Sequence, residues 1–244
     1  MKGLTPIFKR ELWAYFHSPI AYVFIIIFLI SNVGCTFLLG NFYNSNQASL
    51  ESFFLFHPWL YLLLIPAVGM RLWAEERQAG TVELLLTFPV TTITAVVSKF
   101  LAAWAFIAIA LLLTFPMIVT VHYLGDADNG PILAGYFGSL LMAGAYLAIA
   151  SCTSALTKNQ VISFIVSVVI CLILVLLGWG VLNNILNSLF PVWIADLVSQ
   201  FSFTTHFNAL RRGVIDLRDL IYFVSVIVFM LMVNVVILDS HKSL

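Results

Sequence analysis

Charge and cysteine are both scarce in this 244-residue chain. Only 9% of its residues are charged, and eleven basic and eleven acidic residues give a formal net charge of zero. A chain without net positive charge does not attract the phosphate backbone of nucleic acid over long range, so no nucleic-acid partner is expected. Cys35, Cys152 and Cys171 stand singly in apolar stretches, without the paired spacing of a metal site or a disulfide framework. We interpret them as small core residues.

Sequence motifs for catalysis and for nucleotide binding are also missing. There is no G-x-x-x-x-G-K-[ST] loop to cradle ATP, no H-E-x-x-H zinc motif and no G-x-S-x-G nucleophile elbow. The five histidines are scattered, and the apolar stretches contain almost no ionisable residue that could relay protons. We therefore predict no catalytic site, no metal site and no cofactor on this chain, and any energy source must lie in another polypeptide.

Hydrophobic residues, by contrast, make up 62% of the chain, and the mean hydropathy is +1.06. These values are typical of a polytopic membrane protein. Since one span needs about 20 residues, the chain has room for six spans and little else. The sequence predicts an all-α integral membrane fold, with residues 1–244 forming a single transmembrane domain. The predicted spans cover residues 20–39, 53–70, 92–121, 132–156, 161–181 and 220–238.

The basic residues divide unevenly between the two sides of this arrangement. Arg211, Arg212 and Arg218 fall on one side, and the other eight Lys and Arg residues fall on the side of the N-terminus. The bias predicts that both termini are cytoplasmic. Residues 1–18 are expected to form an interfacial helix with Glu11 on its water-facing side, and no cleaved signal is expected. Lys99, near the start of the third span, is expected to snorkel to the inner headgroups.

The longest polar interruption, residues 71–92, separates the second and third spans. Gly80 permits a sharp reversal, Thr81 is a good cap for a short helix, and Glu83 falls in its first turn, at the positive end of the helix dipole. Pro89 would end that helix after Phe88. The helix would present apolar side chains at the water boundary, which indicates that it docks into a groove of another protein.

The residues of this interruption, E-E-R-x-x-G-T-V-E-L-L-L-T-x-P-V-T, resemble the cytoplasmic loop of type-2 ABC transporter permeases. In that family the loop forms a coupling helix that docks on the ATP-binding subunit. The resemblance implies that ATP and Mg²⁺ are bound by a separate partner ATPase. The partner-binding residues it implies are Glu75, Glu76, Gly80, Thr81, Glu83, Leu84, Leu85, Phe88 and Pro89.

Residues 182–219 are too polar for a span and too apolar for a solvated linker. By the same resemblance they would form re-entrant helices in the outer leaflet. Arg211, Arg212 and Asp216 would then anchor this segment at the outer headgroups, or act as an outer gate or a site for an extracytoplasmic partner.

The stretch H-F-N-A-L-R-R-G-V-I-D-L-R-D-L-I-Y-F, residues 206–223, looks like the gliding-motility (GldF-like) branch of these permeases, with the NosY-type permeases next. The expected function is the membrane subunit of an ATP-driven exporter in the bacterial inner membrane. Its expected partners are cytosolic ATPases, membrane lipids and a second permease, either another copy or a related chain. The alternative is a scaffold or channel that anchors a cytosolic ATPase without transporting anything.

Overall fold

All the regular secondary structure in the part of the chain that the structure describes is helical. A computed structural model describes residues 4–40, 42–43, 47–81, 91–180, 182, 188 and 191–240. The first half contains α1 (Leu4–His17), α2 (Pro19–Gly34), a π-helical extension η1 (Cys35–Leu39), α3 (Glu51–Leu55), α4 (His57–Gly69) and α5 (Arg71–Ala79). The second half contains α7 (Thr92–Leu112), α8 (Phe115–Leu124), α9 (Asn129–Leu156), α10 (Gln160–Leu176), α12 (Val192–Ser199), α13 (Phe203–Arg211) and α14 (Leu217–Ser240).

Helix α9 is the centre of the bundle. It packs against α4, α5, α7, α10, α13 and α14. Of the residues in its most apolar 18-residue stretch, 72% are buried. Small residues along α9 allow these close approaches, as the spacing of Gly135, Ser139 and Ala143 predicts. A Cβ added at Gly69 of α4 would overlap Ala150 of α9, so a side chain larger than hydrogen does not fit where these two helices cross.

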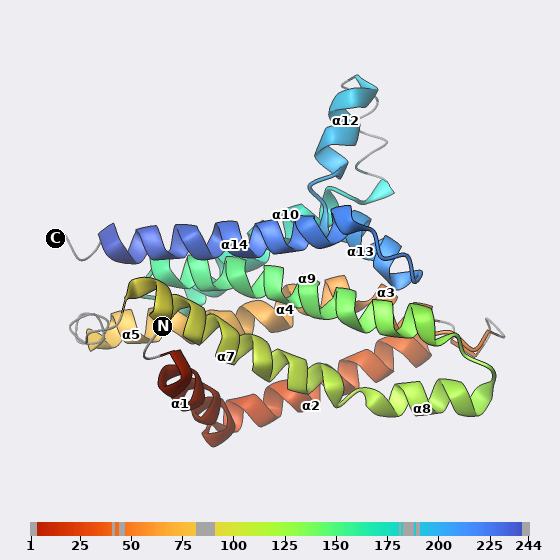
Figure 1. Cartoon of the computed structure of the whole chain (residues 1–244), viewed down its shortest axis with the longest axis horizontal. Coiled ribbons are helices and arrows are strands. Elements are labelled where there is room, and N and C mark those ends of the chain that lie inside the picture. The colour runs from red at the N-terminus through yellow and green to blue at the C-terminus, as the bar shows by residue number, and fades with distance from the viewer. Residues whose placement is uncertain are drawn as a thin grey trace.

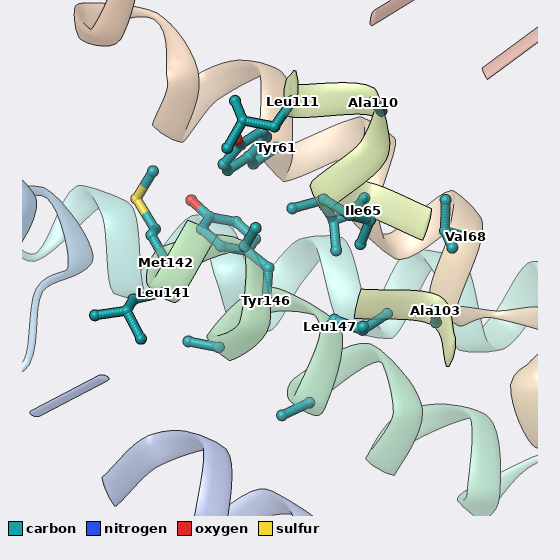
Figure 2. Packing of buried hydrophobic residues seen from close by; sticks show 14 of the residues in the cluster. Tyr61, Ile65, Val68, Ala103, Ala110, Leu111, Leu141, Met142, Tyr146 and Leu147 are labelled. Atoms are coloured by element: carbon teal, nitrogen blue, oxygen red, sulfur yellow. The ribbon is translucent and has the colours of Figure 1, made fainter. Parts of the chain in front are cut away.

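Buried hydrophobic side chains pack together where α4, α7 and α9 meet (Figure 2). Tyr61 and Ile65 come from α4, Leu111 from α7, and Tyr146 and Leu147 from α9, and all five are buried. The Tyr61 and Tyr146 rings meet edge to face, with their centroids 6.3 Å apart. Aromatic pairs favour this geometry, which adds specificity to the burial of apolar surface.

Polar side chains also join α9 to its neighbours. Thr153 hydrogen-bonds Ser167 of α10, and Asn234 of α14 donates to Ser151 Oγ over 2.7 Å. Trp104 Nε1 of α7 donates to the Leu140 carbonyl over 2.9 Å. Buried polar groups need partners inside the protein, so these bonds restrict how each helix can pack on α9.

Among the residues that the structure describes, four helical segments are long and apolar enough to cross a membrane: Pro19–Leu39, Thr92–Leu124, Asn129–Leu156 and Leu217–Ser240. All four agree with the predicted spans to within three residues at each end. The third predicted span has an unpredicted break between α7 and α8, where Pro116 lies in the first turn of α8. A proline lacks the N–H that would continue the α7 hydrogen-bond ladder, which explains the break.

The other two predicted spans are shorter as helices. α10 has 17 residues, and the second predicted span is divided into α3 and α4 by a turn at Phe56. Pro58 stands in the first turn of α4 and Pro66 lies inside α4, as expected for an interrupted span. By length and composition, the described part of the chain therefore contains about four helices that could span a membrane, and six spans are not shown.

The long helices run along one common direction (Figure 1). The start of α1, helix α5 and the end of α14 all lie at one end of the bundle, which we call the α5 end. Helices α3 and α13 lie at the other end, the α13 end. Helix α12 extends sideways from the bundle near the α13 end, at a steep angle to the long helices.

Candidate functional site

The candidate site is the α5 end, where the polar interruption begins. Residues 71–79 form helix α5, whereas the sequence predicts them only as part of a loop. Met70 alone separates α5 from α4. The first N–H groups of a helix lack partners within it. Here Ser154 of α9 supplies them, because its Oγ accepts from the N–H of Trp73 (3.0 Å) and Ala74 (2.9 Å) and donates to the Met70 carbonyl (2.8 Å).

A second contact attaches the other end of α5 to α9. The Arg77 guanidinium donates from Nη1 to the Ala155 carbonyl, one of the last carbonyls of α9. Cations are favoured at helix C-termini, where carbonyl groups lack partners within the helix. Partial burial lowers the pKa of Arg77 from its ordinary value, but a guanidinium stays charged. Helix α5 is therefore held on α9 at both of its ends.

The third contact is an ion cluster around Lys99 of α7. Its ammonium lies 2.7 Å from Glu76 Oε1 of α5 and 3.4 Å from Glu11 Oε2 of α1, and it donates to the Leu72 carbonyl over 3.3 Å. It also lies 5.2 Å from the centroid of the Trp73 ring. The Lys99 side chain is only 3% exposed. A single buried cation thus joins α1, α5 and α7.

This cluster corrects two predictions. Lys99 does not snorkel toward the membrane surface, because two carboxylates and a carbonyl satisfy its ammonium inside the bundle. Glu11 does not face water, since its side chain is only 16% exposed. Burial would raise the pKa of the Glu11 carboxyl, but Lys99 and Arg10 outweigh burial and hold this pKa below its ordinary value.

Helix α5 ends at Gly80, which has a positive φ of 70°. Its N–H donates to the Glu76 carbonyl, and the Thr81 hydroxyl donates to the same carbonyl over 3.3 Å. A left-handed residue after the last turn is a common way to end a helix, and glycine adopts it without strain. Gly80 therefore has the left-handed conformation that a sharp reversal needs, but the course of the chain from residue 82 to residue 90 lies outside the described residues, so the reversal itself stays a prediction.

The predicted partner-binding residues fall into two groups. Glu75, Glu76, Gly80 and Thr81 lie along α5 and at its end, with Glu75 paired to Arg71 at the surface. Glu83, Leu84, Leu85, Phe88 and Pro89 lie outside the described residues, so their role stays a prediction. The sequence reasoning missed Arg77 and Ser154 as anchors of α5. A serine near the end of a long apolar helix carries no distinct signal, and no acidic residue stands close to Lys99 in the sequence, so neither anchor could be read from local sequence.

The outer candidates, Arg211, Arg212 and Asp216, lie at the α13 end. Arg211 is 9% exposed and pairs with Glu51 of α3 over 3.2 Å, whereas Arg212 is exposed. Burial lowers the pKa of Arg211, and Glu51 partly offsets this effect. Asp216 caps α14 by accepting from the N–H of Arg218. The structure therefore pairs Arg211 with another helix rather than with the nearby acidic residues.

Asp219 at the α13 end takes a different partner. Its Oδ1 lies 2.6 Å from His206 Nδ1, and His206 Nε2 lies 2.8 Å from the Gln200 carbonyl. The imidazole stacks on Tyr222 with ring centroids 4.0 Å apart. These contacts join α13 to the start of α14 and explain why residues 203–211 pack on the bundle. No group of three or more potential metal ligands occurs among the residues that the structure describes.

A helical bundle with long apolar segments, and a polar helix attached at one end, is the architecture of a multi-pass membrane protein. Residues 44–239 match the family described as "ABC-2 family transporter protein". The chain therefore belongs to the ABC-2 family of transporter membrane proteins and is the membrane component of an ABC-2 type transporter. Members of this family are non-catalytic membrane subunits that work with ABC ATPase subunits. No curated protein matches the chain.

Proposed function

We propose that this chain is the permease subunit of an ATP-driven exporter and that α5 passes movement of the ATPase into the bundle. The observation that carries this proposal is the Lys99 cluster, in which one buried ammonium joins α5 to α1 and α7. Separating a buried ammonium from its carboxylates costs free energy, because the charge is left uncompensated. These three helices therefore resist independent movement. A displacement at the Gly80 end of α5 is thus shared with α1 and α7.

In this proposal the partner ATPases bind ATP and Mg²⁺, and residues 81–89 form the coupling helix that docks on them. Closure of the ATPases pushes the coupling helices together, and the movement reaches a pathway at the interface between two permeases. The second permease is another copy or a related chain. The proposal includes six spans, cytoplasmic termini and a place in the bacterial inner membrane. It also includes the GldF-like branch, on the resemblance of residues 206–223.

Substitutions at Gly80 test the coupling role. Gly80 has φ 70°, and a Cβ at this position would meet no atom of the described residues within 4 Å, so among these residues the backbone conformation is what limits the side chain that fits there. Asparagine tolerates this left-handed conformation, whereas β-branched valine does not. We expect Gly80→Val to lower permease-stimulated ATP hydrolysis of the copurified ATPase several-fold and Gly80→Asn to leave it near normal. Normal stimulation in Gly80→Val would contradict the coupling role.

The same purification separates the transporter from the alternative. A complex whose ATP hydrolysis responds to the permease supports transport. A stable complex without any change in nucleotide turnover supports a scaffold or channel that only anchors the ATPase.

The proposed orientation has its own test. Single cysteines at Asn46 and Asp128, in a background without the native cysteines, should react with an impermeant thiol reagent added outside intact cells. A cysteine at Gln78 of α5 should react only after the membrane is opened. Labelling of Gln78 in intact cells would reverse the orientation.

A further inference from the structure

The His206 ring of α13 lies between three groups from different parts of the chain. Its Nδ1 lies 2.6 Å from Asp219 Oδ1, in the first turn of α14, and its Nε2 lies 2.8 Å from the carbonyl oxygen of Gln200. Gln200 belongs to the connection between α12 and α13, residues 200–202. The third group is the Tyr222 ring of α14, stacked on the imidazole with centroids 4.0 Å apart. His206 therefore joins the 200–202 connection to α14.

The partners of the imidazole determine how many protons it needs. A backbone carbonyl oxygen only accepts hydrogen bonds, so Nε2 has to carry a proton to bond Gln200. An ionised carboxylate also only accepts, so Nδ1 needs a proton to bond Asp219. A neutral imidazole has one N–H and can satisfy only one of these partners. Both hydrogen bonds are made only when the pair of His206 and Asp219 holds one additional proton.

That proton belongs on the ring. Imidazole is a stronger base than a carboxylate, and the ionised Asp219 attracts the imidazolium that results. The His206 and Asp219 side chains are only 15% and 11% exposed, so water screens this attraction little. The face of the Tyr222 ring also favours a cation stacked on it. All three partners of the ring therefore favour its charged form.

The other helices that pack against α13 bring no competing charge to His206. These helices are α3, α9 and α10. Glu51 of α3 pairs with Arg211 instead, and α9 and α10 contain no Asp, Glu, Lys or Arg. Their tyrosines and cysteines are uncharged below about pH 8. On α14, Arg218 precedes Asp219 but is exposed. Among the described residues, the charge that faces the ring is thus Asp219.

The 200–202 connection depends on His206 more than α13 itself does. Its second bond to α14 runs from the Tyr222 hydroxyl to the Phe201 carbonyl over 2.5 Å, and Tyr222 is the residue that stacks on His206. The first turn of α13 has a separate attachment, because the Thr204 hydroxyl donates to the Val175 carbonyl of α10 over 3.2 Å. Loss of the His206 contacts would therefore release the connection while α13 stays on the bundle.

We propose that His206 and Asp219 form a proton-dependent switch that holds the 200–202 connection, and with it the end of α12, on α14. Helix α12 extends sideways from the bundle at this connection (Figure 1). When the proton leaves, Nδ1 turns a lone pair toward the carboxylate, the contact breaks and the connection is released. Histidine side chains change charge between about pH 5 and 8, so the contact is closed in acid and opens as the pH rises.

The switch does not depend on the coupling role of α5. Under the orientation given under Proposed function, it would respond to the pH outside the cell. The hydrogen bonds that carry the inference are the same in either orientation.

Nitrogen NMR of the purified protein, labelled with nitrogen-15 in its histidines, measures the protonation directly. The His206 signals are identified by their loss in His206→Gln. We expect both ring nitrogens of His206 to carry a proton at pH 6 and only one of them at pH 8.5. A ring with a single N–H at pH 6 would overturn the proposal.

Amide hydrogen exchange tests whether the proton holds the connection. The amides of Phe201 and Ser202 donate to the last turn of α12, so they report on this junction. A hydrogen bond to a charged group corresponds to about tenfold in an equilibrium constant. After correction for the intrinsic effect of pH, we expect exchange at these amides to be several-fold to about tenfold faster at pH 8.5 than at pH 6, with α9 unchanged. Equal corrected rates at the two pH values would refute the switch.

Two variants separate a proton-dependent role from a merely structural one. In Asp219→Asn, the side-chain amide can donate to Nδ1 of a neutral ring while Nε2 donates to Gln200, so no additional proton is needed. We expect slow exchange at both pH values in this variant. His122→Gln, at an exposed histidine of α8, should keep the pH dependence of the parent. The proposal is wrong if Asp219→Asn retains that dependence or if His122→Gln abolishes it.

Discussion

Each end of the bundle holds a buried cation, but the two cations are shared differently. At the α5 end, Lys99 is 3% exposed and its carboxylates on α1 and α5 are 16% and 21% exposed. At the α13 end, Arg211 is 9% exposed, but its partner Glu51 is 51% exposed. A pair with one partner in water contributes little, whereas removing one member of a buried pair leaves an uncompensated charge. The α5 end is therefore the more sensitive to substitution.

Replacing Lys99 should have the largest effect. Lys99→Met leaves Glu11 and Glu76 without their shared cation, and breaking a buried pair costs about 3–5 kcal/mol. We expect the melting temperature of the purified protein to fall by roughly 6–12 °C, as about 3 kcal/mol implies for a chain of this size. Lys158→Met, at an exposed lysine between α9 and α10, is the control and should change it little. Equal melting of both variants would show that the Lys99 cluster does not stabilise the α5 end.

Removing the Ser154 hydroxyl should come second. Ser154→Ala leaves the N–H groups of Trp73 and Ala74 without an acceptor, and each buried unsatisfied group costs about 1–3 kcal/mol. We expect faster amide hydrogen exchange across α5 and unchanged exchange in α14. Ser225→Ala, which removes a hydroxyl that bonds only within its own helix, is the matched control. If both variants exchange alike at α5, Ser154 does not hold this helix.

Arg211 provides the direct comparison at the other end. Arg211→Gln should lower stability by about 1 kcal/mol, because the half-exposed Glu51 regains water once its partner is gone. Arg212→Gln, next to it and exposed, should change stability by less than about 0.5 kcal/mol. Chemical unfolding of both variants beside Lys99→Met measures the difference between the two ends. A loss at Arg211 as large as the loss at Lys99 would remove that difference.

The smallest effect should be the acid dependence that Glu11 contributes. The folded protein holds the pKa of Glu11 below its ordinary value of 4.5. A lowered carboxyl pKa stabilises the fold above the ordinary value, and this stabilisation is lost as the pH falls below 4.5 through the folded pKa. Glu11→Gln should therefore be less stable than the parent at pH 6 by about 0.5 kcal/mol and closer to it in acid. A constant difference across pH would show that Glu11 does not titrate with folding.

The sequence was sufficient to predict the helices that depend on hydrophobicity alone. Span-length apolar runs gave α2 with η1, α9 and α14 close to their observed bounds, and Ser18-Pro19 marks the start of α2. The turn between α9 and α10 was also predictable, because Lys158 and Asn159 interrupt two apolar runs. These features follow from local composition, which does not depend on what packs against each helix.

The features that the sequence did not predict depend on contacts between distant helices. Residues 71–79 have a polar composition, and their helix depends on Ser154, about 80 positions later in the chain. Lys99 and Glu11 lie on amphipathic or boundary segments where solvent exposure is the ordinary expectation. Only the assembled bundle brings them within 3.4 Å of each other. Tertiary contacts therefore decide the geometry of the candidate site.

Helix α4 is tied to α9 at both of its ends. His57, at the start of α4, hydrogen-bonds Ser139 over 2.7 Å, and the Pro58 carbonyl accepts from Tyr146. At the end of α4, the Met70 carbonyl accepts from Ser154. Ser139 and Ser154 are about 22 Å apart along α9 at 1.5 Å per residue. Attachment at both ends resists bending of α4 away from α9, so under the proposed coupling role we expect a displacement of α5 to tilt this pair rather than to bend α4.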